Sequence, residues 1–221
     1  TAFVILEPIQ GESGIIVAPE GFLQEVRKLC DEKGILLIFD EIQAGLGRTG
    51  RLWACDHWNT APDILCLAKG IAGGVPMGAT LVRPDILASM NKGEHSSTFG
   101  GNPISCAAGI AALKALTEDG LIENSEKMGK IFRDGLEKLK EKHTMIREIR
   151  GKGLMIGIEM KFEIKDILMG LIKEGILMLY SGRNILRILP PLVISEDDIT
   201  KVLHALDSIL TKEEQKRNVQ R

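Results

Sequence analysis

Residues 35–43 read ILLIFDEIQ, in which five apolar residues are followed by the acidic pair Asp40 and Glu41. Before this run, apolar residues recur at helical spacing between Pro19 and Gly34. A first apolar run, Phe3–Leu6, comes before that helix. Parallel strands need a crossover connection, so a strand, a helix and a second strand in this order predict a parallel pair in an α/β domain.

The rest of the chain extends this domain and adds a second one. Two short strands, expected at 64–67 and 79–82, surround a glycine-rich turn, and helices are expected at 84–91 and 103–117. We therefore assign residues 1–118 to a large domain with a mostly parallel sheet. Mixed helix and strand patterns predict a small α+β domain over 119–211, followed by a frayed polar tail over 212–221. Its expected elements are helices at 120–142, 164–174 and 197–210 and strands at 146–149, 154–160, 176–179 and 185–189.

Composition favours a small-molecule function. The 221 residues are 44% hydrophobic and 26% charged, with 28 basic and 30 acidic residues and a formal net charge of -2. This balance gives no general attraction to nucleic acid or to a membrane surface, and no apolar stretch approaches the roughly 20 residues of a membrane span. The four cysteines and four histidines lack metal-site spacing, so we expect no metal and reduced thiols in a cytoplasmic protein.

Two residues stand where α/β folds place ligand-binding groups. Asp40 ends the run at 35–39, and Lys69 follows the run at 64–67. An amine desolvated at a strand end would favour the neutral form that attacks carbonyl groups. Taken singly, each has a plainer explanation: Asp40 could cap a strand-to-loop junction, and Lys69 could extend its amine to solvent.

Six segments together resemble the class III (ornithine/acetylornithine-type) aminotransferases, which use pyridoxal 5'-phosphate (PLP) and have PLP fold type I. The resemblance runs from about residue 2 to residue 210, and the segments occur in family order. They are EPIQGE at 7–12, FDEIQ at 39–43, GRTG at 47–50, DILCLAKG at 63–70, STFGGNP at 97–103 and LRILPPL at 186–192.

The resemblance implies roles at the cofactor. Lys69 matches the lysine that holds PLP as a Schiff base, and Asp40 matches the aspartate that keeps the pyridine nitrogen protonated. Ile42 would pack on the ring and Gln43 would bind near its phenolic oxygen, while Glu41 is expected to point elsewhere. Thr98 matches a residue that reaches the PLP phosphate of the neighbouring subunit, which implies a homodimer with shared sites. Without that context, Ser97 and Thr98 would be a simple hydroxyl-rich loop.

The resemblance also implies substrate contacts and a reaction. Arg187 matches the arginine that takes the α-carboxylate of glutamate and 2-oxoglutarate, Glu12 the glutamate that pairs with it, and Ser97 a substrate contact. Within the family, the segments at 150–157 and 186–192 look most like acetylornithine aminotransferases. We therefore expect transfer of the ω-amino group of N-acetylornithine, or of a related acylated diamino acid, to 2-oxoglutarate in arginine or lysine biosynthesis. Ornithine or 4-aminobutyrate as substrate is the alternative.

The chain also departs from the family pattern. A complete member would carry roughly two-fifths of its length before residue 1, including a phosphate-binding loop and a ring-stacking aromatic residue. We therefore expect a C-terminal fragment that binds PLP weakly and transaminates poorly alone. Two further interpretations remain open: an inactive structural or dimerising module, and a Schiff-base lysine enzyme without PLP, which would leave Asp40 and Gln43 unexplained.

Overall fold

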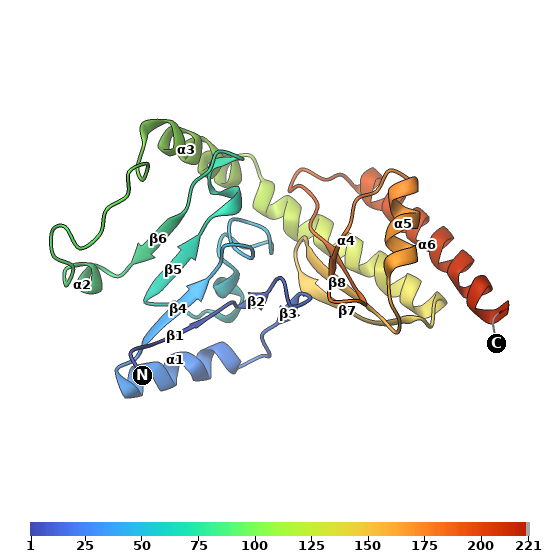
Figure 1. Cartoon of the computed structure of the whole chain (residues 1–221), viewed down its shortest axis with the longest axis horizontal. Helices are drawn as coiled ribbons and strands as arrows, with labels where there is room; N and C mark the ends of the chain where they lie inside the picture. The colour runs from blue at the N-terminus through green and yellow to red at the C-terminus, as the bar shows by residue number, and fades with distance from the viewer. Residues whose placement is uncertain (220–221) are drawn as a thin grey trace. The chain divides into compact units, whose positions relative to one another are not determined.

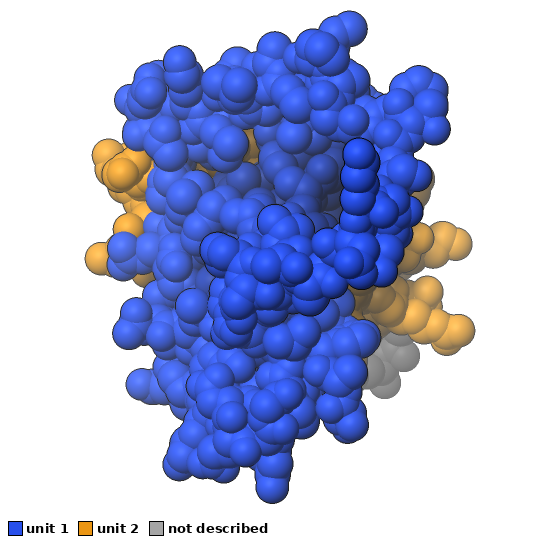
Figure 2. All heavy atoms as spheres, turned by 90° about the vertical axis from the view of Figure 1, so that its left-hand side faces the viewer, with its two compact units in different colours: residues 1–9, 18–122 blue, residues 10–17, 123–221 orange. Residues whose placement is uncertain are grey.

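The structure is a computed structural model that describes residues 1–219. Two compact units account for these residues and are coloured separately in Figure 2. Unit 1 comprises Thr1–Ile9 and Ala18–Ile122. Unit 2 comprises Gln10–Val17 and the described chain from Glu123 onward. The expected division at residue 118 did not foresee that the short segment 10–17 groups with the C-terminal unit.

Unit 1 is built on a four-stranded sheet in the order β1-β4-β5-β6 (Figure 1). β1 (Phe3–Leu6) and β4 (Leu36–Asp40) are parallel, β4 and β5 (Ile64–Leu67) are parallel, and β6 (Ala79–Val82) is antiparallel to β5. The predicted mostly parallel α/β sheet is confirmed. Two 3-10 turns, η1 (Ala54–Trp58) and η2 (Lys69–Ala72), and two helices, α2 (Pro84–Leu87) and α3 (Pro103–Glu118), complete the unit.

The crossover between β1 and β4 is α1 (Phe22–Lys33). Gly34 ends it in the left-handed conformation with φ of 63°, which glycine adopts at low cost, and its backbone N–H donates to the Asp31 carbonyl. Leu23 and Cys30, seven residues apart on one helical face, are buried. The same spacing that predicted the helix therefore anchors it.

Unit 2 contains an antiparallel sheet in the order β7-β8-β10-β9, so the second part of the expected fold class is also confirmed. Its strands are β7 (Ile146–Lys152), β8 (Met155–Met160), β9 (Leu179–Ser181) and β10 (Ile185–Ile188). Three helices accompany them: α4 (Leu121–Lys142), α5 (Lys165–Lys173) and α6 (Glu196–Val219). The apolar core includes Phe132, Leu136, Ile156, Leu171 and Leu206.

The turn between β7 and β8 fits closely against α4. A Cβ atom added at Gly129 would lie 2.1 Å from the Gly153 carbonyl oxygen, so only glycine allows this approach. Arg133, one turn further along α4, donates to the same carbonyl over 2.9 Å. The glycines around residue 152 therefore serve helix packing, which agrees with their interpretation as a turn of the small domain.

Several expected elements have other limits in the structure; the strand expected at 146–149, for example, continues to Lys152. The helix expected at 84–91 ends at Leu87, and the strand expected at 176–179 is displaced to β9. The expected tail from 212 is wrong as far as Val219, because α6 continues through it; Gln220 and Arg221 lie outside the described residues. Contacts within and beyond the helix stabilise this extension: Arg217 pairs with Glu213 over 2.7 Å and lies 3.5 Å from the centroid of the Phe162 ring.

A short two-stranded ribbon joins β1 to α1. It pairs β2 (Ile9–Gln10) with β3 (Ile16–Val17). Ala18 donates its backbone N–H to the Pro8 carbonyl over 3.2 Å at the base of this ribbon. The loop at its tip, 11–15, carries Glu12.

Asp63 links three elements of unit 1. Its buried carboxylate accepts hydrogen bonds from the Leu37 amide at 2.7 Å, from Arg27 on α1 at 2.8 Å and from Arg83 after β6 at 2.5 Å. Burial alone would raise the pKa of Asp63, but these three donors outweigh it and hold the pKa below its ordinary value. Because this pKa is lowered, the carboxylate stabilises the fold above about pH 4 and loses that effect as the pH falls through the lowered pKa.

We therefore predict that Asp63→Asn lowers the free energy of unfolding by about 3 kcal/mol at neutral pH, because it leaves two guanidinium groups short of a partner. Urea unfolding followed by circular dichroism measures the change, and the deficit should shrink below about pH 4. Asp85→Asn, which alters an exposed partner of Arg83, is the matched control and should change stability little. An equal effect of both variants would contradict the prediction.

Candidate functional site

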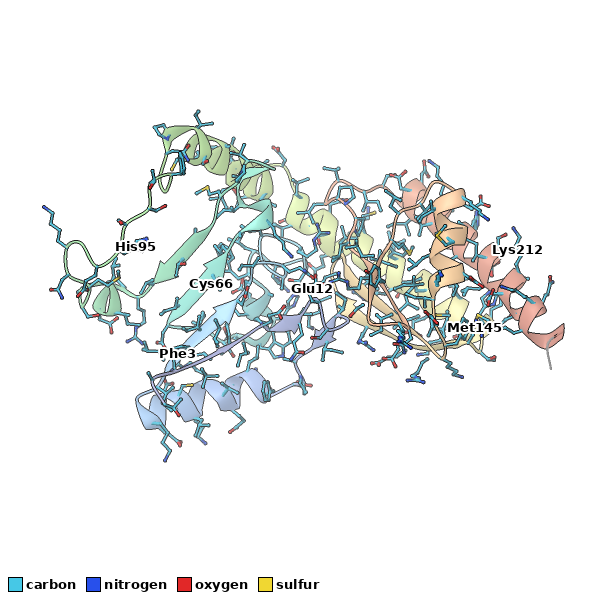
Figure 3. All side chains as sticks on the ribbon, in the orientation of Figure 1. Phe3, Glu12, Cys66, His95, Met145 and Lys212 are labelled. Atoms are coloured by element: carbon cyan, nitrogen blue, oxygen red, sulfur yellow. The ribbon has the colours of Figure 1, made fainter. Side chains whose placement is uncertain are left out.

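The carboxyl ends of β4 and β5 bring the first two predicted site residues to one edge of the sheet. Asp40 is the last residue of β4 and pairs in register with Cys66 on β5. Lys69 follows β5 directly and opens η2. Because the strands are parallel, both residues leave the sheet at the same edge. Figure 3 labels Cys66, the partner of Asp40, one residue before β5 ends at Leu67.

The backbone at Lys69 is unusual. Its φ of 51° lies in the left-handed region, and Ala68 before it, with φ of -162° and ψ of -145°, lies outside both the helical and the regular β region. A side chain with a Cβ atom pays roughly 1 kcal/mol in this region, and such strain gathers at functional sites. The chain therefore turns sharply between strand and 3-10 turn, and the lysine is displayed at the turn.

Lys69 is exposed within this chain, so the expected desolvation of its amine is not provided by the described residues. Its amine also forms no salt bridge there. The side chain is therefore free to meet a carbonyl group at the sheet edge, but exclusion of water from the amine would have to come from a ligand or another polypeptide.

The Asp40 carboxylate keeps one oxygen available. Oδ1 accepts the Ile42 backbone N–H over 3.0 Å, which folds the DEIQ segment back on itself, and the Asp40 carboxylate makes no other hydrogen bond within residues 1–219. Burial, and then the negative charge of Asp40, raises the pKa of the neighbouring Cys66 thiol. The free carboxylate oxygen can accept a proton-bearing nitrogen.

Glu41 points into the protein, as expected. Its fully buried carboxylate accepts the first two N–H groups of η1, from Ala54 at 2.6 Å and from Cys55 at 2.7 Å. Burial raises the pKa of Glu41, and the two amide donors oppose that effect. The Glu41 carbonyl also accepts the Gly45 N–H over 2.9 Å. A Cβ atom added at Gly45 would lie too close to the same carbonyl oxygen, so this turn requires glycine. Glu41 thus fixes the loop in which Asp40, Ile42 and Gln43 lie.

The remaining predicted residues of unit 1 lie on loops. Ile42 and Gln43 are half-buried in the turn after β4. Ser97 and Thr98 lie in the exposed loop between α2 and α3, where Figure 3 labels His95. The Ser97 hydroxyl accepts the Gly100 N–H over 3.0 Å, and neither Ser97 nor Thr98 hydrogen bonds to Asp40 or Lys69. The structure therefore gathers Asp40, Ile42, Gln43 and Lys69 around two strand ends, while Ser97 and Thr98 stand on a separate loop.

Unit 2 brings together the two predicted substrate residues. Arg187 on β10 donates through Nη1 to Glu12 Oε1 over 2.8 Å and to the Gly11 carbonyl over 3.0 Å. The Arg187 side chain is 7% exposed and that of Glu12 is 76% exposed. The Nε atom of Arg187 is buried without a hydrogen-bond partner. A buried guanidinium with an unused donor is a suitable receptor for a carboxylate.

Three contacts hold the segment 10–17 against the sheet of unit 2. Ser181 donates its hydroxyl to the Glu12 carbonyl over 2.5 Å, and Arg150 donates to the Gly14 carbonyl over 2.9 Å. Gly157, the partner of Arg187 in the β8–β10 ladder, allows close approach, since an added Cβ would lie 3.0 Å from the Gly14 carbonyl oxygen. These contacts explain why Glu12, far away in sequence, reaches Arg187.

The sequence reasoning did not single out Ser181, Arg150 or the capping role of Glu41. The alternation of side chains past β4, which turns residue 41 away from residue 40, was the available signal for Glu41. Ser181 and Arg150 act through backbone carbonyls of a distant segment, and no motif signals such a contact. Among the described residues, no group of three or more histidine, cysteine or acidic side chains has the arrangement of a metal site.

No helix of residues 1–219 combines the length and the apolar character required to cross a membrane.

Comparison with known proteins identifies relatives of this arrangement. Residues 1–210 match the family model described as aminotransferase class-III. The acetylornithine aminotransferase of Caldanaerobacter subterraneus subsp. tengcongensis is 47% identical over 210 residues, covering 95% of this chain and 53% of the relative. Ornithine aminotransferase 1 of Staphylococcus saprophyticus is 44% identical, covering 96% of this chain and 54% of the relative. The chain thus spans about half the length of the curated relatives it matches.

Solved structures agree with the sequence relatives. An ornithine aminotransferase from Toxoplasma gondii superposes with a TM-score of 0.93 at 40% identity, covering 98% of this chain and 52% of that one. Its description reports partial occupancy of PLP at that protein's active site. At this identity and coverage, the likeness extends over both units of the described chain.

The backbone strain at residue 69 leads to a stability test. We predict that Lys69→Gly is more stable than Lys69→Ala by about 1 kcal/mol in urea unfolding, because only glycine adopts this φ without a Cβ conflict. At Lys28, exposed within α1, the order should reverse by a similar amount, because glycine is a poor helix former. If alanine were the more stable residue at both positions, the strain at Lys69 would be refuted.

Proposed function

The chain belongs to the class III aminotransferase family, and we propose that it carries the cofactor-attaching half of a PLP-dependent aminotransferase. The observation that carries the proposal is the meeting of Asp40 and Lys69 at one sheet edge, together with the buried arginine of unit 2. We assign residues 1–118 to the PLP-binding large domain and residues 119–211 to the small domain.

The residues at the strand ends fit PLP. Lys69 offers an amine without a salt bridge, and Asp40 offers a carboxylate oxygen that no group of the described chain engages. Ile42 and Gln43 follow on the loop that Glu41 fixes, within reach of the same edge. Lys69 would attach the cofactor, Asp40 would face the pyridine nitrogen, Ile42 would cover the ring and Gln43 would bind near the phenolic oxygen.

The chemistry divides between cofactor and protein. Bound PLP supplies the electron sink that makes removal of a proton from the substrate carbon feasible. The Asp40 carboxylate holds the proton on the pyridine nitrogen, because a negative charge close to a cationic nitrogen favours its protonated form. Lys69 would hold the cofactor through Nζ, and the same amine would serve as the base that moves a proton at the substrate carbon.

Arg187 and Glu12 support a two-substrate pocket. The α-carboxylate of a bound substrate can accept hydrogen bonds from the Arg187 guanidinium, including one from Nε, which has no partner in the structure. Glu12 can yield its place because its own side chain is largely exposed and returns to solvent, while the incoming carboxylate compensates the buried Arg187 guanidinium. When an ω-amine donor without that carboxylate binds, Glu12 stays on Arg187 and neutralises it.

For the substrates, we propose the ω-amino group of N-acetylornithine, or of a related acylated diamino acid, as donor and 2-oxoglutarate as acceptor. The products would be a semialdehyde and glutamate. Relatives named for acetylornithine and relatives named for ornithine match this chain at similar identity, so ornithine is the second candidate donor. A comparison of the two amines in one assay separates them.

A homodimer is part of the proposal, because Ser97 and Thr98 would serve the site of the neighbouring subunit. The surface around them is apolar: Phe99 is 82% exposed, and Ile104 and Ile110 on α3 are 77% and 59% exposed. Apolar surface of this extent on one helix and its preceding loop is typical of an interface between proteins. Thr98 would bind the cofactor phosphate and Ser97 the substrate.

Reductive trapping tests the cofactor lysine. We predict that borohydride treatment of the chain with excess PLP, followed by peptide mapping, places the pyridoxyl group on Lys69, because its amine forms no salt bridge and stands at the same sheet edge as Asp40. Asp40→Asn should lower the yield, and Lys28, exposed on α1, should remain unlabelled. No adduct would favour a structural or dimerising module, and an adduct formed only by substrate would favour a lysine enzyme without PLP.

Arg187→Lys tests the carboxylate receptor in an active enzyme. We predict that it lowers kcat/KM for 2-oxoglutarate by roughly 100-fold, because a point charge replaces a planar bidentate donor. The half-reaction of the ω-amine donor should change far less. Glu12→Gln should show the opposite selectivity, impairing the donor half-reaction more. Equal losses in both half-reactions for both variants would contradict the proposed pocket.

A further inference from the structure

The edge strand β9 of unit 2 is unprotected. It lies at the end of the sheet order and pairs with β10 alone among the described strands. Its neighbourhood is apolar and exposed: Leu177 is 85% exposed, Leu179 49% and Tyr180 64%. Natural edge strands are usually blunted by lysine, proline or a bulge, and the run from Leu177 to Tyr180 contains none of these.

A groove runs beside this edge. A cavity of about 410 Å³ lies between α5 and the segment leading into β9. Leu168, Met169 and Ile172 line it from α5, and Met178 and Tyr180 line it from the strand side. Two methionines give the wall an adaptable surface, and the volume is that of a bound side chain with its backbone or of a small ligand.

The β-ladder tells which side of the sheet each residue faces. Tyr180 pairs with Leu186, which belongs to the core shared with the helices, so Tyr180 and Met178 face the α5 side. Leu179 pairs with Arg187 and faces the opposite side. A strand added at this edge would place alternate side chains into the groove and beside Leu179.

Positive charge stands at one end of the groove. The Ile164 N–H donates to the Arg183 carbonyl over 3.0 Å, which brings Arg183 beside residues 163–165. Arg183 and Lys165 both line the cavity and form no salt bridge with any residue in the described range. Glu163 also lines the cavity, so the three charged lining residues carry one net positive charge. The remaining positive charge complements a carboxylate on whatever fills the groove.

We propose that the groove between β9 and α5 binds an extended polypeptide segment, which pairs with the β9 edge, inserts an apolar side chain against α5 and sets a carboxylate beside Arg183. The site lies outside the residues assigned to cofactor and substrate, and the inference goes beyond the proposed function. Strand addition supplies affinity through main-chain hydrogen bonds and specificity through alternate side chains.

The free edge favours a polypeptide over a small carboxylate. A small molecule could occupy the cavity and the charge, but it would leave the outer backbone groups of β9 and the exposed Leu177 and Leu179 in water. A second copy of this chain could pair β9 with β9 in antiparallel fashion, but this would set Arg183 of each copy beside Leu177 of the other and leave the positive charge of the groove without a carboxylate. The acidic extended segment satisfies the edge, the groove and the charge at once.

Selection from a display library of short random peptides tests the proposal. We expect the intact chain to enrich peptides with alternating apolar residues and an acidic end. A synthetic peptide with a selected sequence should protect the backbone amides of residues 179–181 from hydrogen exchange. Arg183→Met should weaken its binding about tenfold, and Met169→Glu should weaken it roughly 100-fold, as expected for loss of a charged hydrogen bond and for a charge placed in an apolar groove.

The controls separate this site from folding and from the proposed enzyme. Lys173→Met, an exposed change on α5 outside the groove, and Lys69→Ala should bind the peptide unchanged. Ile172→Glu, at a half-exposed position, should repeat the loss if Met169→Glu fails to fold. No enrichment, or equal binding to Met169→Glu, would overturn the proposal. Self-association of the chain that depends on the groove would also overturn it. So would protection of the amides of residues 179–181 by 4-phenylbutyrate, a small apolar carboxylate, in the absence of a peptide.

Discussion

The parallel pairing of β4 with β5 is the constraint on which the site depends. Once Asp40 is in register with Cys66, the chain after each strand must leave the sheet at the same edge. The carboxylate of Asp63 holds this pairing from the opposite end, because it binds the Leu37 amide of β4 and guanidinium groups from α1 and the end of β6. Unit 1 is thus fixed at one end by a buried ion network and left open for chemistry at the other.

The open end is where the local rules of folding are broken. Lys69 takes a conformation that suits glycine, and Glu41 keeps a carboxylate fully buried against two backbone amides. Each feature costs stability, and each orders a residue that would contact the cofactor. Strain displays the lysine, and the buried carboxylate fixes the loop that carries Ile42 and Gln43. A scaffold without chemistry would have no reason to retain either cost.

The spacing of apolar residues and the glycines and prolines that bound each run were enough to predict most of the regular elements. The stop at Gly34 gave the end of α1 to the residue, although the helix begins at Phe22 and not at the expected Pro19, and the apolar runs gave β1, β4, β5 and β6. Contacts between distant segments were beyond that reasoning. The segment at 10–17 joins unit 2 through Arg150, Ser181 and the bare Cα of Gly157, and none of these signals its partner in sequence. The extension of α6 depends likewise on Phe162 from another element. The exposure of Lys69 matches the plainer explanation, an amine extended to solvent, because no neighbour among the described residues covers this strand end.

Arg187 shows how one buried group can serve more than one partner. Its position is fixed by β10, by Gly11 and by the close packing at Gly157, so the guanidinium stays in place whatever occupies it. Glu12 is held by its backbone through Ser181, while its side chain is largely exposed where it pairs with Arg187. Glu12, the exposed partner, is therefore the one that can be displaced, and Arg187, the buried partner, keeps its position. Leu179 of the edge strand pairs with Arg187 itself, so a segment added at β9 would lie next to the strand that pairs with the proposed receptor. Occupancy of the edge and the geometry of the carboxylate site are thus joined by a single rung of the ladder.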